Sequence, residues 1–321
     1  GIMQIYRAGV IGLGAIGNEF RAERLAHARF EVEAAWDPSA AACDAARTRH
    51  PDLTLAKDAA AIFASPDIDV VYIASPPQTH CAYIRAAVEA GKAIYCEKPL
   101  GVDLSESRAV AKLVAESGLP NIVNFNHARA LSSNFIEDQI AAGAVGKILG
   151  MDTSIHVATW PREFQKAATW LARRDQGGFT REMISHWVCL SQRLLGPGKI
   201  VTKKIRYPAD GTSAETWLLA ELDFGGVPHV IKAACGGAGP VGTECSVWGE
   251  KQSFRLYPGG LLRSTGIEPW REALADIGDI AHQDRKRALD GVAAHLAGEP
   301  AKMASIADAL AVQELIEAIL R

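Results

Sequence analysis

Short apolar runs alternate with Ala-rich amphipathic stretches along the first 125 residues. This alternation is the βαβ pattern of a parallel sheet with helices on both faces. The apolar runs predict strands at Tyr6–Ile11, Glu31–Trp36, Asp69–Ala74, Ala93–Cys96 and Asn121–Phe125. The amphipathic stretches predict helices at Ala15–Ala28, Ser39–His50, Lys57–Ala64, Thr79–Ala90 and Ser105–Ser117. Residues 1–125 are therefore expected to form an α/β domain with a doubly wound parallel sheet.

After residue 125 the pattern changes to a helix, a glycine-punctuated region and then consecutive strands joined by short turns. The strands are predicted at Ile148–Val157, Ile200–Tyr207, Thr216–Phe224, His229–Ala234, Glu244–Gly249 and Ser253–Tyr257. Two helices, Pro269–Ala297 and Ser305–Leu320, are expected to end the chain. Because consecutive strands imply antiparallel pairing, residues 126–321 are expected to form a second, α+β domain with a large, mostly antiparallel sheet. This domain is the candidate for substrate binding and oligomerisation.

Composition narrows the class of protein. Of the 321 residues, 48% are apolar and 22% are charged, which is typical of a globular protein. The 34 Lys plus Arg against 37 Asp plus Glu leave a net charge of −3, so no basic field exists to attract nucleic acid. No apolar run reaches the roughly 18 residues of a membrane span. The six scattered cysteines are expected to be reduced and buried, which predicts a cytoplasmic location.

A GxGxxG sequence from Gly12 to Gly17 follows the first predicted strand. Gly12 permits a tight turn, Gly14 lets the backbone approach a pyrophosphate, and Gly17 allows close packing of the next helix on the strand. Backbone amides of Ala15 and Ile16 would then face the phosphates from the helix N-terminus. The motif and its context predict a Rossmann-type dinucleotide site. No motif with metal-ligand spacing is present.

Asp37 ends the second predicted strand, about 20 residues after the last of these glycines. Its carboxylate can accept hydrogen bonds from a ribose 2′-hydroxyl and would repel the 2′-phosphate of NADP, so NAD is preferred over NADP as the cofactor. Alternatively, Asp37 caps the helix that starts at Pro38. The sequence leaves both roles open.

Two more polar segments follow predicted strands. The carboxyl ends of the strands in a doubly wound sheet form the ligand crevice. We therefore expect cofactor contacts from a first segment containing Ser75, Pro76 and His80 and from a second containing Glu97 and Lys98. A Lys ammonium can also donate to a hydroxyl and stabilise the oxyanion formed when that hydroxyl loses its proton. The alternatives are plain turn chemistry for the first segment and an exposed ion pair for the second.

A helix predicted at Phe179–Leu195 carries Glu182 and His186 on one face. Their i, i+4 spacing lets a carboxylate orient an imidazole or relay its proton. The alternative is a solvated pair on an exposed helix. Polar residues nearby in the chain are further candidates for lining a cleft, without an assigned catalytic role: Asn124, Asn126, His127, Arg129, Trp160, Arg162 and Trp170.

Taken together, the glycine motif, Asp37, the Ser75–His80 loop and the Glu97-Lys98-Pro99 tripeptide resemble the glucose–fructose oxidoreductase, inositol dehydrogenase and MocA-like (Gfo/Idh/MocA) family. The resemblance covers nearly the whole chain. It implies an NAD(P)-dependent dehydrogenase of a sugar, cyclitol or related compound, with Lys98 in the active site. Members of this family commonly form dimers or tetramers.

The family also has a signature in its sheet domain: paired glycines, an Asp, a His four residues later and often another Asp three beyond that. Here Gly177–Gly178 precede Glu182, and His186 stands at the position of the signature His. Glu182 replaces the Asp, Ile184 replaces a usual Gly, and Cys189 occupies the place of the later Asp. The signature is therefore present in an altered form.

These observations predict transfer of a hydride between a nicotinamide and a secondary alcohol or ketone. His186 would be the general base, Lys98 would stabilise the developing charge, and Glu182 would orient His186. The altered signature keeps open a reductase of an imine or other non-sugar acceptor, and a non-catalytic nucleotide-binding regulator is the alternative from another class. Retention of Lys98 and His186 favours an enzyme. The expected partners are a small-molecule substrate and further copies of the chain, as a homodimer or homotetramer through the C-terminal sheet.

Overall fold

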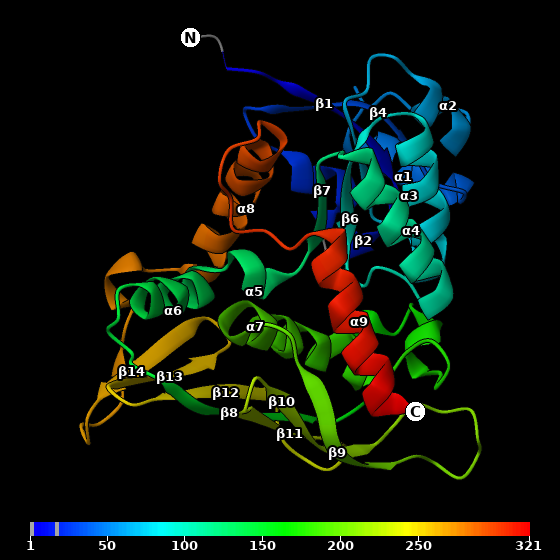
Figure 1. Cartoon of the computed structure of the whole chain (residues 1–321). Coiled ribbons are helices and arrows are strands. Elements are labelled where there is room, and N and C mark those ends of the chain that lie inside the picture. Colours follow the sequence, from blue (N-terminus) through cyan, green and yellow to red (C-terminus); the bar gives the residue numbers. More distant parts are fainter. Residues whose placement is uncertain (1–2, 17–18) are drawn as a thin grey trace. The chain divides into compact units, whose positions relative to one another are not determined.

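The computed structural model describes residues 3–16 and 19–321. The chain divides into two compact units, Gly1–Phe125 with Ala288–Gln313 and Asn126–Arg287 with Glu314–Arg321 (Figure 1). The sequence assigned residues 288–313 to the second domain, whereas the structure groups them with the first unit. The reason is that helix α8 (Ile280–Leu296) contributes Leu289, Val292 and Ala293 to the core of that unit.

The first unit contains a five-stranded parallel sheet in the order β4-β1-β5-β6-β7. Its strands are β1 (Tyr6–Ile11), β4 (Phe30–Trp36), β5 (Val70–Ile73), β6 (Ala93–Glu97) and β7 (Asn121–Asn124). Its connecting helices are α1 (Ala40–Arg49), α2 (Ala59–Ala64), α3 (His80–Glu89) and α4 (Leu104–Ser117). All five strands lie within two residues of their predicted bounds, and the predicted doubly wound α/β class is confirmed.

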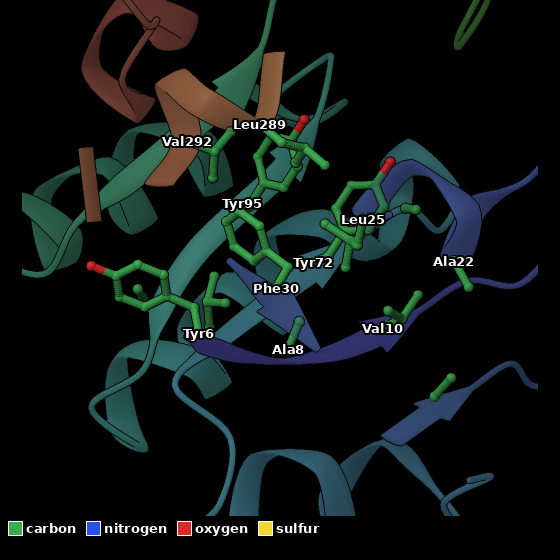
Figure 2. Packing of buried hydrophobic residues seen from close by; sticks show 14 of the residues in the cluster. Tyr6, Ala8, Val10, Ala22, Leu25, Phe30, Tyr72, Tyr95, Leu289 and Val292 are labelled. Carbon is green, nitrogen blue, oxygen red and sulfur yellow. The ribbon is translucent and has the colours of Figure 1, made fainter. Parts of the chain in front are cut away.

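One face of this sheet carries an aromatic core (Figure 2). The rings of Tyr72 and Tyr95, from neighbouring strands, stack with centroids 4.8 Å apart. Phe30 packs into the same cluster, and Leu289 and Val292 of α8 cover it. Burial of a large apolar side chain stabilises a fold by about 1.5–3 kcal/mol, so this cluster anchors α8 firmly to the sheet.

The helix predicted at Ala15–Ala28 is wrong. The described residues of this segment form two short strands, β2 (Ala15–Ile16) and β3 (Glu19–Phe20), and then a 3₁₀ helix at Arg21–Leu25. Ala15 pairs with Phe20 and Ile16 with Glu19 in antiparallel register, so the described backbone here is extended rather than helical. Ala22 and Leu25 are nevertheless buried, as the apolar pattern of the segment required.

The second unit contains an eight-stranded sheet in the order β15-β14-β13-β12-β8-β11-β10-β9. Its strands are β8 (Ile148–Val157), β9 (Lys199–Arg206), β10 (Trp217–Phe224), β11 (Val227–Cys235), β12 (Gly242–Gly249), β13 (Gln252–Tyr257), β14 (Gly260–Thr265) and β15 (Arg271–Glu272). Every pairing is antiparallel except that of β8 with β11, so the mostly antiparallel sheet is confirmed.

The helix predicted at Pro269–Ala297 begins later than expected, at Ile280. Strand β15 and a 3₁₀ helix at Ala275–Ile277 occupy the preceding residues, and β14 was not predicted. Gly278 interrupts the apolar spacing that suggested one long helix, because glycine disfavours helix interiors. The last predicted helix is present as α9 (Ile306–Leu320).

Helices α5 (Asn126–Arg129), α6 (Leu131–Ala141) and α7 (Ser185–Leu195) lie over one face of this large sheet (Figure 1). A π-helical segment, Thr180–Ile184, leads directly into α7. Short 3₁₀ helices occur at Pro77–Thr79, Glu163–Gln165 and Thr169–Ala172.

A buried polar network fixes α7 on the sheet. The Ser191 hydroxyl of α7 hydrogen-bonds to Nδ1 of His229 in β11, and Oγ1 of Thr153 in β8 lies 2.7 Å from Nε2 of the same ring. His229 is completely buried, and this burial lowers its pKa to about 3. The network is therefore a neutral, fully paired connection that sets the position of α7 on the sheet.

Candidate active site

Loops at the carboxyl ends of β1 and β5 meet where the strand order of the parallel sheet reverses. β4 and β5 lie on opposite sides of β1, which makes this edge the expected ligand crevice of a doubly wound sheet. Gly12 has φ +103°, and a Cβ there would lie 2.6 Å from the carbonyl carbon of Ala74 and 2.7 Å from the nitrogen of Ser75. Only glycine permits this approach of the two loops.

Asp37 connects the end of β4 to the glycine loop. Its Oδ2 accepts from the Leu13 amide at 2.9 Å, and its Oδ1 accepts from the Ser39 amide at 2.8 Å. The N-cap of α1 is Ser39, whose hydroxyl accepts from the Ala42 amide. The structure therefore contradicts the helix-cap alternative for Asp37, because the carboxylate holds the glycine loop and a different residue caps the helix.

The rest of the glycine motif differs from the expected helix N-terminus. Gly14 is exposed, and no atom lies within 4 Å of the position that a Cβ would take there, so a ligand can approach this stretch of backbone. Ala15 and Ile16 belong to β2 and present no helix N-terminus to a phosphate. Gly17 lies outside the described residues. The exposed backbone at Gly14 and the close approach of the two loops at Gly12 leave room for a ligand at this edge of the sheet.

His80 holds two loops together. Its ring is buried, with Nδ1 2.7 Å from the Pro99 carbonyl oxygen and Nε2 2.7 Å from the Ser75 carbonyl oxygen. Burial lowers the pKa of His80, and the two carbonyl acceptors act in the opposite direction. Both ring nitrogens are engaged by backbone, so His80 positions the loops and has no nitrogen left for a ligand. Pro76 is exposed at the surface of the same turn.

Glu97 joins the carboxyl ends of three neighbouring strands. Its carboxylate accepts from the Tyr72 hydroxyl of β5, from Asn124 Nδ2 of β7 at 3.2 Å and from Arg24 Nη1 at 3.1 Å. Burial, followed by the charge of Glu97, raises the pKa of Tyr72 well above its usual value, so the phenol stays protonated as a donor. Glu97 was expected to contact cofactor, and its described contacts are with the protein.

Lys98 follows Glu97 in the turn between β6 and α4. Its side chain is partly exposed, and the Lys98–Pro99 peptide bond is cis. The Pro99 carbonyl oxygen is held by His80, and Glu97 is held by its three partners. Residues on both sides of Lys98 are therefore fixed to the sheet edge, which leaves the ammonium on a rigid turn.

A pocket of about 490 Å³ lies within the second unit. It brings together polar side chains from α5, the π-helical segment, α7, the β13–β14 turn and the N-terminal end of α8. The residues that bear on chemistry are His127, Arg162, Glu182, His186, Tyr257 and Asp284. Glu182 and His186, which the sequence paired by spacing, both line this pocket. Tyr257 and Asp284 were not predicted, because their chain positions carry no motif and only the fold brings them here.

The paired glycines position the segment that carries Glu182 and His186. A Cβ on Gly177 would lie 2.2 Å from the Leu171 carbonyl oxygen, and one on Gly178, with φ +94°, would lie 1.9 Å from Glu215 Oε1. Glu215 is buried, its pKa is raised by that burial, and its Oε2 accepts from the Thr180 amide at 3.0 Å. The glycines therefore let the π-helical segment start against a buried carboxylate. π-Helical turns are frequent at functional sites.

His127 lies beside His186 in the pocket. Its ring packs on Trp187 with centroids 4.3 Å apart and meets the His186 ring edge to face at 6.2 Å. Burial, with a smaller effect of the Arg129 charge, lowers the pKa of His127 to about 4. Its Nδ1 is buried without a hydrogen-bond partner among the described residues. A neutral imidazole thus packs on the helix that carries the expected base.

In residues 3–16 and 19–321, no helix has both the length and the apolar character needed to cross a membrane. No group of three or more His, Cys, Asp or Glu side chains in the described residues is arranged to hold a metal ion. All six cysteines are free thiols.

Comparison with known proteins relates this chain to NAD-binding oxidoreductases. Residues 6–125 match the GFO_IDH_MocA model, described as "Oxidoreductase family, NAD-binding Rossmann fold". Levoglucosan dehydrogenase of Pseudarthrobacter phenanthrenivorans is 28% identical over 75% of this chain and 62% of its own length. Inositol 2-dehydrogenase of Rhizobium meliloti is 31% identical over 59% of this chain and 55% of its own length. The matched regions thus span less than two thirds of either relative.

The fold of the whole chain also has counterparts among solved structures. A structure of levoglucosan dehydrogenase in complex with NADH has a TM-score of 0.84 at 21% identity, covering 98% of this chain and 96% of that one. A putative myo-inositol dehydrogenase from Sinorhizobium meliloti has a TM-score of 0.78 at 22% identity, covering 98% and 96%. At these identities the likeness establishes the shared fold.

The contact of Gly178 with Glu215 gives a testable prediction. Gly178→Ala is expected to lower the free energy of unfolding by about 2–4 kcal/mol, from the left-handed backbone and the steric overlap with the buried carboxylate. Gly196→Ala is the matched control, since Gly196 has φ +88° but no atom within 4 Å of its Cβ position; it is expected to cost only about 1–2 kcal/mol. Urea unfolding followed by Trp fluorescence measures both. Equal losses would contradict the packing role of Gly178.

Proposed function

We propose that this chain, whose residues 6–125 match the model of the NAD-binding Gfo/Idh/MocA oxidoreductase family, is an NAD(P)-dependent dehydrogenase acting on a secondary alcohol or ketone of a sugar, cyclitol or related small molecule. The observation that carries the proposal is the Gly12 contact at the reversal of strand order, with Asp37 holding the loop. Relatives named levoglucosan dehydrogenase and inositol 2-dehydrogenase support a polyol substrate.

The proposed chemistry separates proton transfer from charge stabilisation. A bound nicotinamide supplies the acceptor for the hydride that leaves the carbinol carbon. His186 takes the hydroxyl proton as the C–O bond becomes a carbonyl, since an imidazole titrates near working pH. Lys98 stabilises the negative charge that develops on the oxygen, and Glu182 orients His186. In the reverse direction, His186 returns the proton and the carbonyl is reduced.

NAD is the proposed cofactor in preference to NADP. The carboxylate of Asp37 is fixed by two backbone amides at the end of β4, where a ribose would lie in this type of site. A 2′-phosphate there would meet a fixed negative charge. Two unit charges about 4 Å apart interact by about 1–4 kcal/mol between bulk water and the protein surface, so the repulsion is large enough to select the cofactor.

Self-association through the large sheet is also proposed. One face of that sheet carries Leu219, Val230 and Trp248, which are 41%, 39% and 39% exposed. Paired residues, and residues two apart in one strand, lie on the same face of a sheet. Leu219 pairs with Lys232, which is two residues from Val230. Val230 pairs with Asp152, and Asp152 pairs with Ser246, which is two residues from Trp248, so all three apolar side chains share one face. Apolar side chains gathered on a sheet face are typical of an interface between subunits.

Replacing Lys98 tests the catalytic assignment. Lys98→Ala is expected to lower kcat by about 10²–10³-fold, the effect of losing one donor to a developing oxyanion, while NAD still binds. Lys112→Ala is the control, because Lys112 is a largely exposed residue of α4. Stopped-flow absorbance of NADH and NAD binding by calorimetry separate the two effects. Unchanged turnover in Lys98→Ala would exclude the proposed role.

Replacing Asp37 tests the cofactor preference. Asp37→Asn removes the charge and keeps a carbonyl acceptor for the loop, so the ratio of kcat/KM for NADP to that for NAD is expected to rise about tenfold. Asp44→Asn, on the exposed side of α1, is expected to leave the ratio unchanged. A ratio that is the same in wild type and Asp37→Asn would show that the carboxylate only holds the glycine loop.

Sedimentation velocity tests the proposed self-association. The wild type is expected to sediment as a dimer or tetramer, and Val230→Glu is expected to shift it to the monomer by placing a charge on the sheet face. Ile267→Glu is the control, because Ile267 is a fully exposed residue in a turn. A wild type that sediments as a monomer at micromolar concentration would refute this part of the proposal.

A further inference from the structure

Arg162 is held rigidly at the wall of the second-unit pocket. Its Nε donates to Gln165 Oε1 at 2.9 Å. Its guanidinium carbon lies 4.8 Å from the ring centroid of Phe164 and 5.8 Å from that of Trp160. The hydrogen bond from Nε and the packing on two aromatic rings hold the Arg162 guanidinium in place. Aromatic packing of this kind limits rotation of the guanidinium.

The outer edge of this guanidinium is not used by the protein. Neither terminal nitrogen of Arg162 has a hydrogen-bond partner in the described part of the chain, and no carboxylate there lies within 4 Å of it. Burial lowers the pKa of Arg162, an effect that the charge of Glu182 partly opposes. Arg162 is half-buried, and a partly desolvated cation in a protein is normally paired with a negative charge.

Glu182 does not fill the vacant edge, because Gln165 lies between the two charges. The Gln165 side chain accepts from Arg162 Nε through Oε1 and donates through Nε2 to Glu182 Oε1 at 3.2 Å. The amide therefore connects the guanidinium to the carboxylate beside His186 and leaves Nη1 and Nη2 of Arg162 available to a ligand.

The other charges of the pocket are committed to the protein or exposed. Asp284 Oδ1 accepts from the Leu131 amide at 2.8 Å, and Arg129 Nη2 donates to Asn126 Oδ1 at 2.9 Å. Arg285 is exposed at the pocket wall. Three arginines against two carboxylates leave the lining with an excess of positive charge.

We propose that Arg162 binds a carboxylate of the substrate, so that the pocket takes a sugar acid in preference to a neutral sugar or cyclitol. The inference rests on the proposed dehydrogenase function and specifies its substrate class. A carboxylate matches the two free nitrogens of a fixed guanidinium in a bidentate pair, the geometry in which Arg is strongest. Hydroxyl groups of a neutral sugar would give the two terminal nitrogens hydrogen-bond acceptors but no counter-charge. A pocket of about 490 Å³ is within the range of small-molecule sites.

Binding of matched acid and neutral compounds to the NADH-bound enzyme tests this proposal. Calorimetry would use glucuronate, galacturonate and gluconate, each paired with its neutral counterpart, glucose, galactose or glucitol. The wild type is expected to bind at least one acid about 10–100-fold more tightly than its neutral partner, the factor expected for hydrogen bonds between charged groups. Arg162→Gln is expected to lose this factor for the acid and to change neutral binding less than about threefold.

Arg173→Gln is the matched control, because Arg173 is an exposed arginine paired with Asp175 outside the pocket lining. It is expected to keep the acid preference. Arg162→Lys keeps the positive charge but loses the planar guanidinium that can make two parallel hydrogen bonds. This variant is expected to retain part of the preference for the acid. Circular dichroism and thermal unfolding of each variant identify any loss of folding, and the graded series of Gln, Lys and Arg keeps the test informative if one variant is unstable.

Two outcomes overturn the proposal: no acid binds the wild type more tightly than its neutral partner, or Arg162→Gln retains the full acid preference. Turnover is measured separately with NAD and the same compounds. If acids bind in an Arg162-dependent way but no compound is oxidised or reduced, the anion site stands and the dehydrogenase proposal fails. If neutral sugars alone bind and turn over, the dehydrogenase proposal stands and the anion site fails.

Discussion

The carboxylate of Glu97 is the contact on which the nucleotide half of the molecule depends. It accepts from Tyr72 of β5, Asn124 of β7 and Arg24, so one side chain connects the ends of three adjacent strands. Parallel strands deliver loops to one edge of a sheet, but the loops need a fixed edge to hold a ligand with defined geometry. Removing the Glu97 side chain would leave the buried, protonated Tyr72 hydroxyl without its acceptor. The Glu97-Lys98-Pro99 tripeptide therefore holds the strand ends together through Glu97 and also carries Lys98.

In the second unit, buried polar contacts hold the segment that carries His186 in place. Gly178 lets the chain turn directly onto the buried carboxylate of Glu215, and the Ser191–His229 contact fixes α7 on the sheet. His186 lies between these two anchors in the chain, one residue into α7. Because the chain is anchored on both sides of His186, the ring keeps its orientation without relying on solvent-exposed contacts. Buried polar groups of this kind are stabilising only when fully paired, as His229 is.

Sequence patterns predicted the strands of the parallel sheet and the loops that follow them, because the spacing of apolar residues and the residue types of turns are local properties of the chain. They failed at residues 15–28, whose described part forms two short strands and a 3₁₀ helix, and at β14 and β15, which carry few apolar residues. Motif spacing paired Glu182 with His186, and both residues line the pocket of the second unit. It did not reveal that His80 and Glu97 would be occupied by protein groups, or that Tyr257 and Asp284 would line the pocket, because those contacts join segments far apart in the chain.

The proposed activity of this chain is hydride transfer between a nicotinamide and a carbinol carbon. The most direct measurement uses NMR to follow deuterium from the carbinol carbon of labelled polyols and sugar acids to C4 of the nicotinamide after incubation with the purified protein and NAD. We expect deuterium at C4 for at least one compound, with the label absent in the Lys98→Ala variant over the same interval. Tight NAD binding without label at C4 for any compound would contradict it and would favour a nucleotide-binding protein without this chemistry.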